Sequence, residues 1–246
     1  MRYHTLVLAV VAAWVAGPLA ARSDAQVMRT LKAGILTVAV TSTASTNPYD
    51  SQLWIRRYVE RCAQELQLKV VWVVVPFNTS WERAGRDEVD LVATNVASFP
   101  DRVSPGGTFS SPFLYERRAL RIHPADQGRY THIDDFVGKR VGVVRGMAAE
   151  RDVRRRAPDG AHIVSTATFV ELYAQFDAGE LEAIAEAEYF ALDGREIPSH
   201  GPEVVLIDLH DLTPGQREAS VFVVRDKSDG LLDAVNAVIA RIRFPL

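Results

Sequence analysis

Cysteine is almost absent from the sequence, since Cys62 is the only one among 246 residues. A single thiol cannot form an internal disulfide, and Cys62 is not placed for lipid attachment near the N-terminus. It falls on an apolar stripe with helical spacing that also contains Leu53, Tyr58, Val59 and Leu66. Because buried cysteines usually behave as small apolar residues, we expect Cys62 to pack in a core rather than to react.

Long hydrophobic runs are also missing. The apolar stretch at 6–16 is too short to span a bilayer, which takes about 20 residues, and no later segment is both long enough and free of charge. Arg2 precedes this stretch and small residues at 23–25 follow it, which is typical of a secretory signal peptide. We therefore expect residues 1–25 to be removed after Ala25 and the mature protein to be periplasmic.

No charge of one sign dominates the chain. There are 28 Lys and Arg against 31 Asp and Glu, which gives a formal net charge of −3 at pH 7. The one basic cluster, RDVRRR at 151–156, is interpreted as the solvated face of a helix. With no helix-turn-helix or zinc-finger spacing either, we expect no nucleic-acid partner.

Common catalytic signatures are absent as well. The sequence contains no GxSxG elbow, no HExxH, no CxxC and no Walker-type glycine loop. Its six histidines are scattered without ligand spacing, so we predict no metal site and no cofactor. What the chain does have is 48% hydrophobic residues, enough for one large domain or for two lobes of about 100 residues each.

Short apolar runs alternate with amphipathic stretches along the chain, which predicts βα units on a mainly parallel sheet. The clearest helix begins at Thr168, has Glu171 placed for a capping box, and ends at Gly179. Another helix is expected at 228–242. The predicted strands are 36–40, 69–75, 91–94, 140–144, 163–165, 183–187, 204–209 and 221–225.

The most informative segment runs from Asp90 to Arg102 and reads DLVATNVASFPDR. An acidic residue at a strand end, a polar turn with free backbone N–H groups and a following arginine can together form a socket for a small carboxylate. Arginine suits this task because its planar guanidinium donates two parallel hydrogen bonds to a carboxylate and stays charged. Taken alone, Arg102 could equally be an ordinary solvated arginine after a turn.

The order of motifs around this segment resembles the extracellular solute-binding proteins of family 3, the amino-acid-type receptors of ABC importers. The matching pieces are GILTVAV from Gly34, NPYD at 47–50, FSSPF at 109–113 and DFVGKRVGVVRG at 135–146, in addition to the Asp to Arg turn. Each piece is weak on its own. Together, in this order, they cover nearly the whole mature chain.

The resemblance implies a two-lobed α/β fold of the type II periplasmic-binding-protein kind, with a two-strand hinge and a ligand cleft between the lobes. It places the first lobe at 26–115 with a return segment at 216–246, and the second lobe at 116–215. The hinge strands are expected around 117–122 and 219–225.

The resemblance also implies a set of ligand-binding residues in the first lobe. Phe77 and Tyr49 correspond to aromatic walls of the pocket, Thr94 and Asn95 to polar groups of the turn, and Arg102 to the residue that binds the ligand carboxylate.

Several positions depart from the family pattern. Ala97 replaces a serine or threonine, and Met147 and Ala148 replace hydroxyl residues at a helix N-terminus, where the helix dipole assists anion binding. Ala187 replaces the aspartate that binds the α-ammonium group of an amino acid. The neighbouring acidic residues, which in a strand would point to the opposite face, are Glu186 and Glu188.

We therefore predict a periplasmic receptor, not an enzyme, that binds a small carboxylate-bearing solute and passes it to the membrane permease of an ABC importer. An unpaired ammonium in an apolar pocket is costly, so an organic acid fits these residues better than a standard amino acid. We expect a monomer. Two alternatives stay open: a dehydratase-like enzyme with Glu186 or Glu188 as general acid, and an accessory or sensor protein without a transport role.

Overall fold

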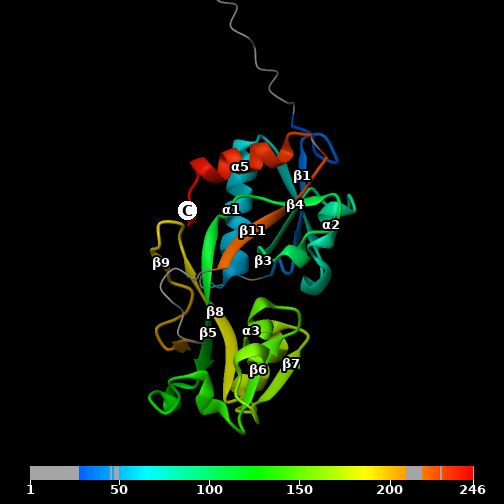
Figure 1. Cartoon of the computed structure of the whole chain (residues 1–246). Coiled ribbons are helices and arrows are strands. Elements are labelled where there is room, and N and C mark those ends of the chain that lie inside the picture. The colour runs from blue at the N-terminus through cyan, green and yellow to red at the C-terminus, as the bar shows by residue number, and fades with distance from the viewer. Residues whose placement is uncertain (1–27, 45, 47–49, 209–217, 228, 246) are drawn as a thin grey trace, which may run out of the picture.

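The computed structural model describes residues 28–44, 46, 50–208, 218–227 and 229–245 (Figure 1). The predicted signal peptide at 1–25 and the predicted aromatic wall Tyr49 lie outside these residues. None of the helices in the described part of the chain is both long and apolar enough to cross a membrane.

One sheet runs through two lobes, and its strands follow the order β2-β1-β3-β11-β5-β8-β6-β7 within the described residues (Figure 1). β1, β2 and β3 are parallel in the first lobe, as are β6, β7 and β8 in the second, which confirms the βα units. The expectation of a mainly parallel sheet is wrong, because the described pairs that involve β4, β5, β9, β10 and β11 are antiparallel. The strands are β1 (Ile35–Val40), β2 (Lys69–Val74), β3 (Leu91–Ala97), β4 (Gly107–Phe109), β5 (Leu114–Ile122), β6 (Arg140–Val144), β7 (His162–Thr166), β8 (Ala183–Phe190), β9 (Glu196–Ile197), β10 (Val205–Asp208) and β11 (Glu218–Arg225).

Helices cover the sheet in both lobes, and their ends follow the sequence signals. Thr168 accepts a hydrogen bond from the backbone N–H of Glu171 at the start of α4, and Gly179 takes the left-handed conformation (φ 72°) that ends it. Cys62 is buried in α1, as expected. The helices are α1 (Ser51–Glu65), α2 (Glu82–Gly85), α3 (Ala148–Arg156), α4 (Phe169–Asp177) and α5 (Leu231–Arg241).

Several strands are longer than the sequence predicted, and the extensions of β3 and β8 matter most for the site. β3 was expected to end at Thr94 in a polar turn, but it continues to Ala97, paired with β11 across a register shift. Asn95 absorbs this irregularity with a left-handed backbone (φ 58°), which asparagine tolerates better than most residues. β8 was expected to end at Ala187, but it continues to Phe190 because it pairs with β5 along its whole length.

Each lobe has its own hydrophobic core. On one face of β5, Leu114 packs in the core of the first lobe, whereas Leu120 and Ile122 pack in that of the second. Glu116 and Arg118 lie on the same face of β5 between these residues, since side chains two apart in a strand share a face. We call this level of the molecule, where β5 passes between the two cores, the waist.

The second strand of the waist is β8 rather than the predicted segment at 219–225. Ala183 and Ala185 of β8 lie in the second core, whereas Ala191, just beyond its end, lies in the first (Figure 1). β11 stays with the first lobe and meets β5 only at 218–220. The hinge prediction was therefore right for β5 and wrong for the partner strand, because β8 is longer than its apolar run suggested.

Candidate functional site

Arg102 lies at the contact between the two lobes. It follows β3 in a short 3-10 turn, its side chain is buried (1% exposed), and its Nη2 donates a hydrogen bond of 2.9 Å to the backbone oxygen of Gly146 in the second lobe. Three aromatic rings surround the guanidinium carbon, with centroids 5.3 Å away for Phe77, 5.2 Å for Trp81 and 5.0 Å for Phe99. Arg102 is thus not a solvated surface residue.

The charge of Arg102 has no direct counter-ion among the described residues, and its Nε has no hydrogen-bond partner there. Burial, followed by the charge of Arg151, lowers the pKa of Arg102 to about 10. The guanidinium is still protonated at neutral pH. The charges of Glu116 and Asp101 act in the opposite direction, but neither forms an ion pair with Arg102. A buried cation without a direct anionic partner is energetically costly, so this arrangement is prepared to receive one.

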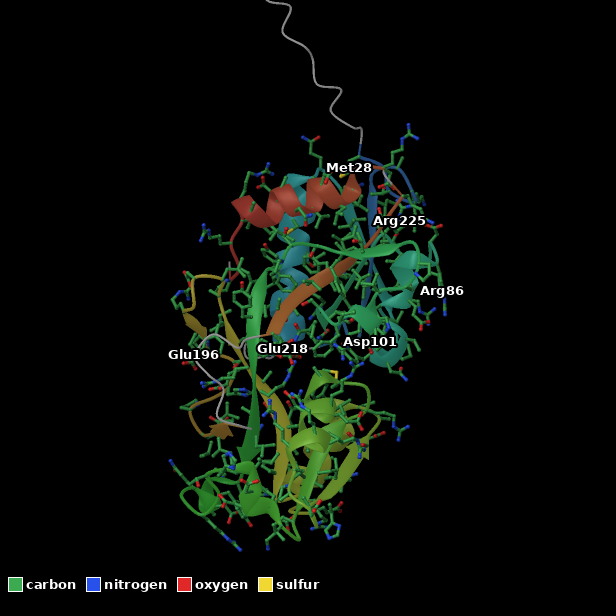
Figure 2. The ribbon with its side chains drawn as sticks, in the orientation of Figure 1. Met28, Arg86, Asp101, Glu196, Glu218 and Arg225 are labelled. Atoms are coloured by element: carbon green, nitrogen blue, oxygen red, sulfur yellow. The ribbon has the colours of Figure 1, made fainter. Side chains whose placement is uncertain are left out.

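Other contacts hold the lobes together beside Arg102. Arg151 of α3 forms a bidentate ion pair with Asp101, in which Nη1 and Oδ1 are 3.2 Å apart. Asp101 lies on the side of the first lobe that faces the second (Figure 2). Arg151 belongs to the cluster interpreted from sequence as a solvated helix face, and it is exposed there while it also bridges the two lobes.

Asp90 does not belong to this site. It is fully buried at the start of β3, where its carboxylate accepts hydrogen bonds from the backbone N–H groups of Leu31 (2.7 Å) and Thr37 (2.9 Å) and from Arg225 Nε (3.2 Å). The expectation that Asp90 and Arg102 form one socket is therefore wrong. Asp90 fixes the first strand of the lobe instead.

The polar residues of β3 have separate roles. Thr94 is fully buried and shares a hydrogen bond of 2.7 Å with Ser80, so its hydroxyl already has a partner. Asn95 reaches the waist, where its Nδ2 donates to the Tyr189 hydroxyl at 3.2 Å, while its buried Oδ1 has no partner among the described residues. Ala97 is buried at the end of the strand.

Met147 and Ala148 lie at the start of α3, beside the Arg102 contact. Met147 precedes the helix without a side-chain capping bond, and Ala148 is buried as its first residue. The backbone N–H of Gly146 donates to Glu150 at 2.7 Å, so the chain's own carboxylate already satisfies one amide donor there. Sequence reasoning missed Glu150, although an acidic residue in the first turn of a helix is a common signal.

Glu186 and Glu188 point to the face of β8 opposite Ala187, as strand geometry predicted. Glu186 lies 3.2 Å from His200 and 3.7 Å from Arg121, and burial raises its pKa. Glu188 forms an ion pair of 2.6 Å with Arg117. The structure brings neither carboxylate into contact with Arg102.

The waist holds a polar network that sequence reasoning missed. Arg118 is buried (6% exposed) between two carboxylates: its Nη1 donates to Glu116 at 3.0 Å and its Nη2 to Glu218 of β11 (Figure 2). Ser220 also donates to Glu116 at 3.1 Å. Burial acts to lower the pKa of Arg118, but Glu116 and Glu218 outweigh it and raise that pKa. We call Glu116, Arg118 and Glu218 the waist triad.

No metal centre can be assembled from these groups. Among the residues that the structure describes, no three His, Cys, Asp or Glu side chains are arranged to hold an ion.

The comparisons with known proteins identify the fold of this chain but no protein of closely related sequence. No protein-family model matches the chain, and no curated protein matches it significantly. The solved structures that match include an amino acid ABC transporter substrate-binding protein, AbpA, from Streptococcus pneumoniae bound to L-arginine, with 18% identity, a TM-score of 0.65 and coverage of 85% of this chain and 88% of that one.

Two further structures match equally well. The arginine-bound form of truncated ArgBP from T. maritima has 18% identity and a TM-score of 0.66 over 85% of this chain and 96% of that one. AncCDT-1, described as an ancestral amino acid-binding protein and a precursor of cyclohexadienyl dehydratase, has 18% identity and a TM-score of 0.66 over 85% and 88%. The chain therefore has the two-lobed α/β fold of the amino acid ABC transporter substrate-binding proteins, and the fold prediction is confirmed.

Proposed function

We propose that the chain is a receptor that binds a small carboxylate-bearing solute, an amino acid or a related organic acid, between its two lobes and delivers it to the membrane permease of an ABC importer. One observation carries the proposal: Arg102 is a buried cation at the contact between the lobes, with no counter-ion among the described residues.

The surroundings of Arg102 suit a carboxylate ligand. A guanidinium can donate two parallel hydrogen bonds to a carboxylate, and the rings of Phe77, Trp81 and Phe99 keep water away from it. Charge-assisted bonds are stronger where water is excluded. Because Arg102 belongs to one lobe and Gly146 to the other, an anion placed between them would link ligand binding to the closure of the lobes.

The structural neighbours support this class of function. They include an amino acid ABC transporter substrate-binding protein bound to L-arginine, the arginine-bound form of ArgBP and an ancestral arginine-binding protein bound to glutamine. A signal peptide at 1–25, a periplasmic location and a monomeric state belong to the same proposal. The proposed lobes are 26–115 with 216–246 and 116–215, except that Ala191 and Ile197 pack in the core of the first lobe. Phe77, Asn95 and Met147 are the residues that we propose to line the site beside Arg102.

The enzyme alternative has less support. One neighbour is a precursor of a dehydratase, and Glu186 has the raised pKa expected of a general acid. However, Glu186 and Glu188 point to the face of β8 opposite Ala187, and both contact basic residues there. A proton donor has to reach the reacting group, so we propose binding without chemistry.

Titration calorimetry against amino acids, dicarboxylates and aromatic acids tests the proposal. We expect stoichiometric binding of at least one carboxylate without turnover. Arg102→Ala should weaken that binding by about 2–5 kcal/mol, the cost of truncating a buried charge pair. Because the buried side chain also packs against three rings, its loss should lower thermal stability too, so circular dichroism and the melting temperature are measured to show that the variant is folded at the temperature of the titration. Arg86→Ala is the control, since Arg86 is an exposed arginine of the same lobe, paired with Glu82 and far from the waist (Figure 2).

The other outcomes separate the alternatives. Formation of a product would favour the dehydratase, and absence of binding across the whole panel would favour the accessory role. An unchanged dissociation constant in Arg102→Ala would remove Arg102 from the site.

A further inference from the structure

Two consecutive residues of the first lobe contact the second lobe. Asp101 and Arg102 follow β3 in the same 3-10 turn. Arg102 donates to the backbone oxygen of Gly146, whereas Asp101 forms a bidentate ion pair with the Arg151 side chain of α3. This ion pair lies at the surface, since the side chain of Asp101 is 58% exposed and that of Arg151 is 48% exposed. One short turn therefore carries a buried contact and an exposed contact between the lobes.

The two contact points on the second lobe are fixed to each other. The backbone N–H of Gly146 donates to one carboxylate oxygen of Glu150 at 2.7 Å, and Ser165 of β7 donates to the other oxygen, also at 2.7 Å. Glu150 lies in the first turn of α3, and Arg151 is the next residue. A movement of the second lobe away from the first would therefore break both contacts together.

Phe99 contacts an arginine from each lobe. Its ring centroid is 5.0 Å from the guanidinium carbon of Arg102 and 5.0 Å from that of Arg151. Both distances allow attraction between the cation and the ring, which extends to about 6 Å. The two guanidinium groups repel each other, however, and after burial the charge of Arg151 is the next cause that lowers the pKa of Arg102. Closure therefore brings like charges together and needs negative charge beside them.

We propose that Phe99, Asp101 and Arg151 form an interlobe latch, in which Asp101 and Arg151 are positioning residues that hold the second lobe against Arg102 without contacting the solute. The inference rests on the receptor function proposed above. Asp101 supplies the negative charge beside Arg151, and the solute carboxylate supplies it beside Arg102. Because the latch acts on closure, it sets how tightly every solute binds and leaves the preference among solutes unchanged.

Asp101→Asn tests the latch, because it removes the charge and keeps the shape of the side chain. Small-angle X-ray scattering should show a more open solute-free protein, and calorimetry should show about two- to fivefold weaker binding of every solute, the range for an exposed ion pair. Asp101→Glu keeps a carboxylate and should restore both. Glu82→Gln is the matched control, since Glu82 forms an exposed ion pair with Arg86 within the first lobe.

Salt and a double-mutant cycle show whether Asp101 acts through Arg151. At about 1 M NaCl the screening length is about 3 Å, so the difference between the unmodified protein and Asp101→Asn should shrink. In an Arg151→Met background, Asp101→Asn should have no further effect on shape or affinity, because its partner is already gone. A full effect of Asp101→Asn in that background would overturn the latch.

The two measurements separate this inference from the receptor function. Unchanged shape and affinity in Asp101→Asn would overturn the latch and leave the receptor function standing. A more open Asp101→Asn protein, with no binding of any amino acid or organic acid by the unmodified protein, would support the latch and overturn the receptor function. Losses of affinity that differ widely among solutes would show that Asp101 contacts the solute, which also overturns the latch.

Discussion

Gly146 provides the sharpest test of how the two lobes come together. It adopts a left-handed backbone (φ +81°), and its oxygen accepts the hydrogen bond from Arg102. A Cβ added at this position would lie 3.2 Å from the Cβ of Asn78 in the first lobe. Gly146→Ala therefore changes both the local backbone and the contact between the lobes.

The backbone effect and the contact with Asn78 can be separated by their magnitudes and by the form of the protein that they affect. A left-handed backbone costs a non-glycine residue about 1–2 kcal/mol, and this cost applies whether the lobes are apart or together. The close approach to Asn78 applies only when they are together, and such overpacking costs about 1–3 kcal/mol. A cost of 1 kcal/mol that falls on the closed form alone corresponds to about a fivefold loss of ligand affinity.

Gly138→Ala is the matched control for the first effect. Gly138 also has a left-handed backbone (φ 69°) and also belongs to the second lobe, but a Cβ there would have nothing within 4 Å. Urea denaturation should give both variants a similar loss of stability. Small-angle X-ray scattering and calorimetry should then show a more open shape and weaker binding for Gly146→Ala alone. Equal affinities in the two variants would refute the argument that this contact limits closure.

Three further predictions concern buried groups. Burial raises the native pKa of Glu186 above 4.5, so its stabilising contribution is complete below that value and is lost as pH rises through the raised pKa. Glu186→Gln should therefore gain melting temperature over the unmodified protein at about pH 8, compared with the difference between the two proteins at about pH 4. The same difference at both pH values would contradict this. Burial, then Glu65, raises the pKa of Cys62 to about 12, so Ellman's reagent at about pH 8 should react only with unfolded protein. Asp90→Ala should cost about 3–5 kcal/mol in urea denaturation, whereas Asp101→Ala, which breaks an exposed pair, should cost less than about 1 kcal/mol; similar losses would show that Asp90 is not a buried anchor.

The parts of the fold that local signals determine could be predicted from the sequence. The cap at Thr168 and the stop at Gly179 depend on residues a few positions apart, and both are found in α4. The extensions of β3 to Ala97 and of β8 to Phe190 depend on partner strands that are distant in the sequence. No local sequence pattern shows which distant strand will pair, so the strand ends that depend on pairing were predicted wrongly.

The residues of the candidate site were likewise predicted only in part from the sequence. The burial of Arg102 agrees with its predicted role, but its aromatic neighbours Trp81 and Phe99 were missed because sequence spacing does not show which rings meet. The predicted role of Asp90 was wrong, because the sequence does not distinguish a buried aspartate that accepts hydrogen bonds from backbone N–H groups from one that lies beside a ligand. A signal for the waist triad was present: Glu116 and Arg118 are at every second position of β5 between Leu114 and Leu120, which places two charges on an otherwise apolar, buried face.

The departures from the family pattern become consistent when the waist triad is included. A carboxylate at position 187 would face Arg118 across the β5–β8 ladder, where Glu116 and Glu218 already provide two negative charges. Arg118 balances only one of these two charges, so a third carboxylate would add to an excess of negative charge in a buried place, which alanine avoids. Ala187 is thus the residue expected opposite an arginine that already has two carboxylate partners.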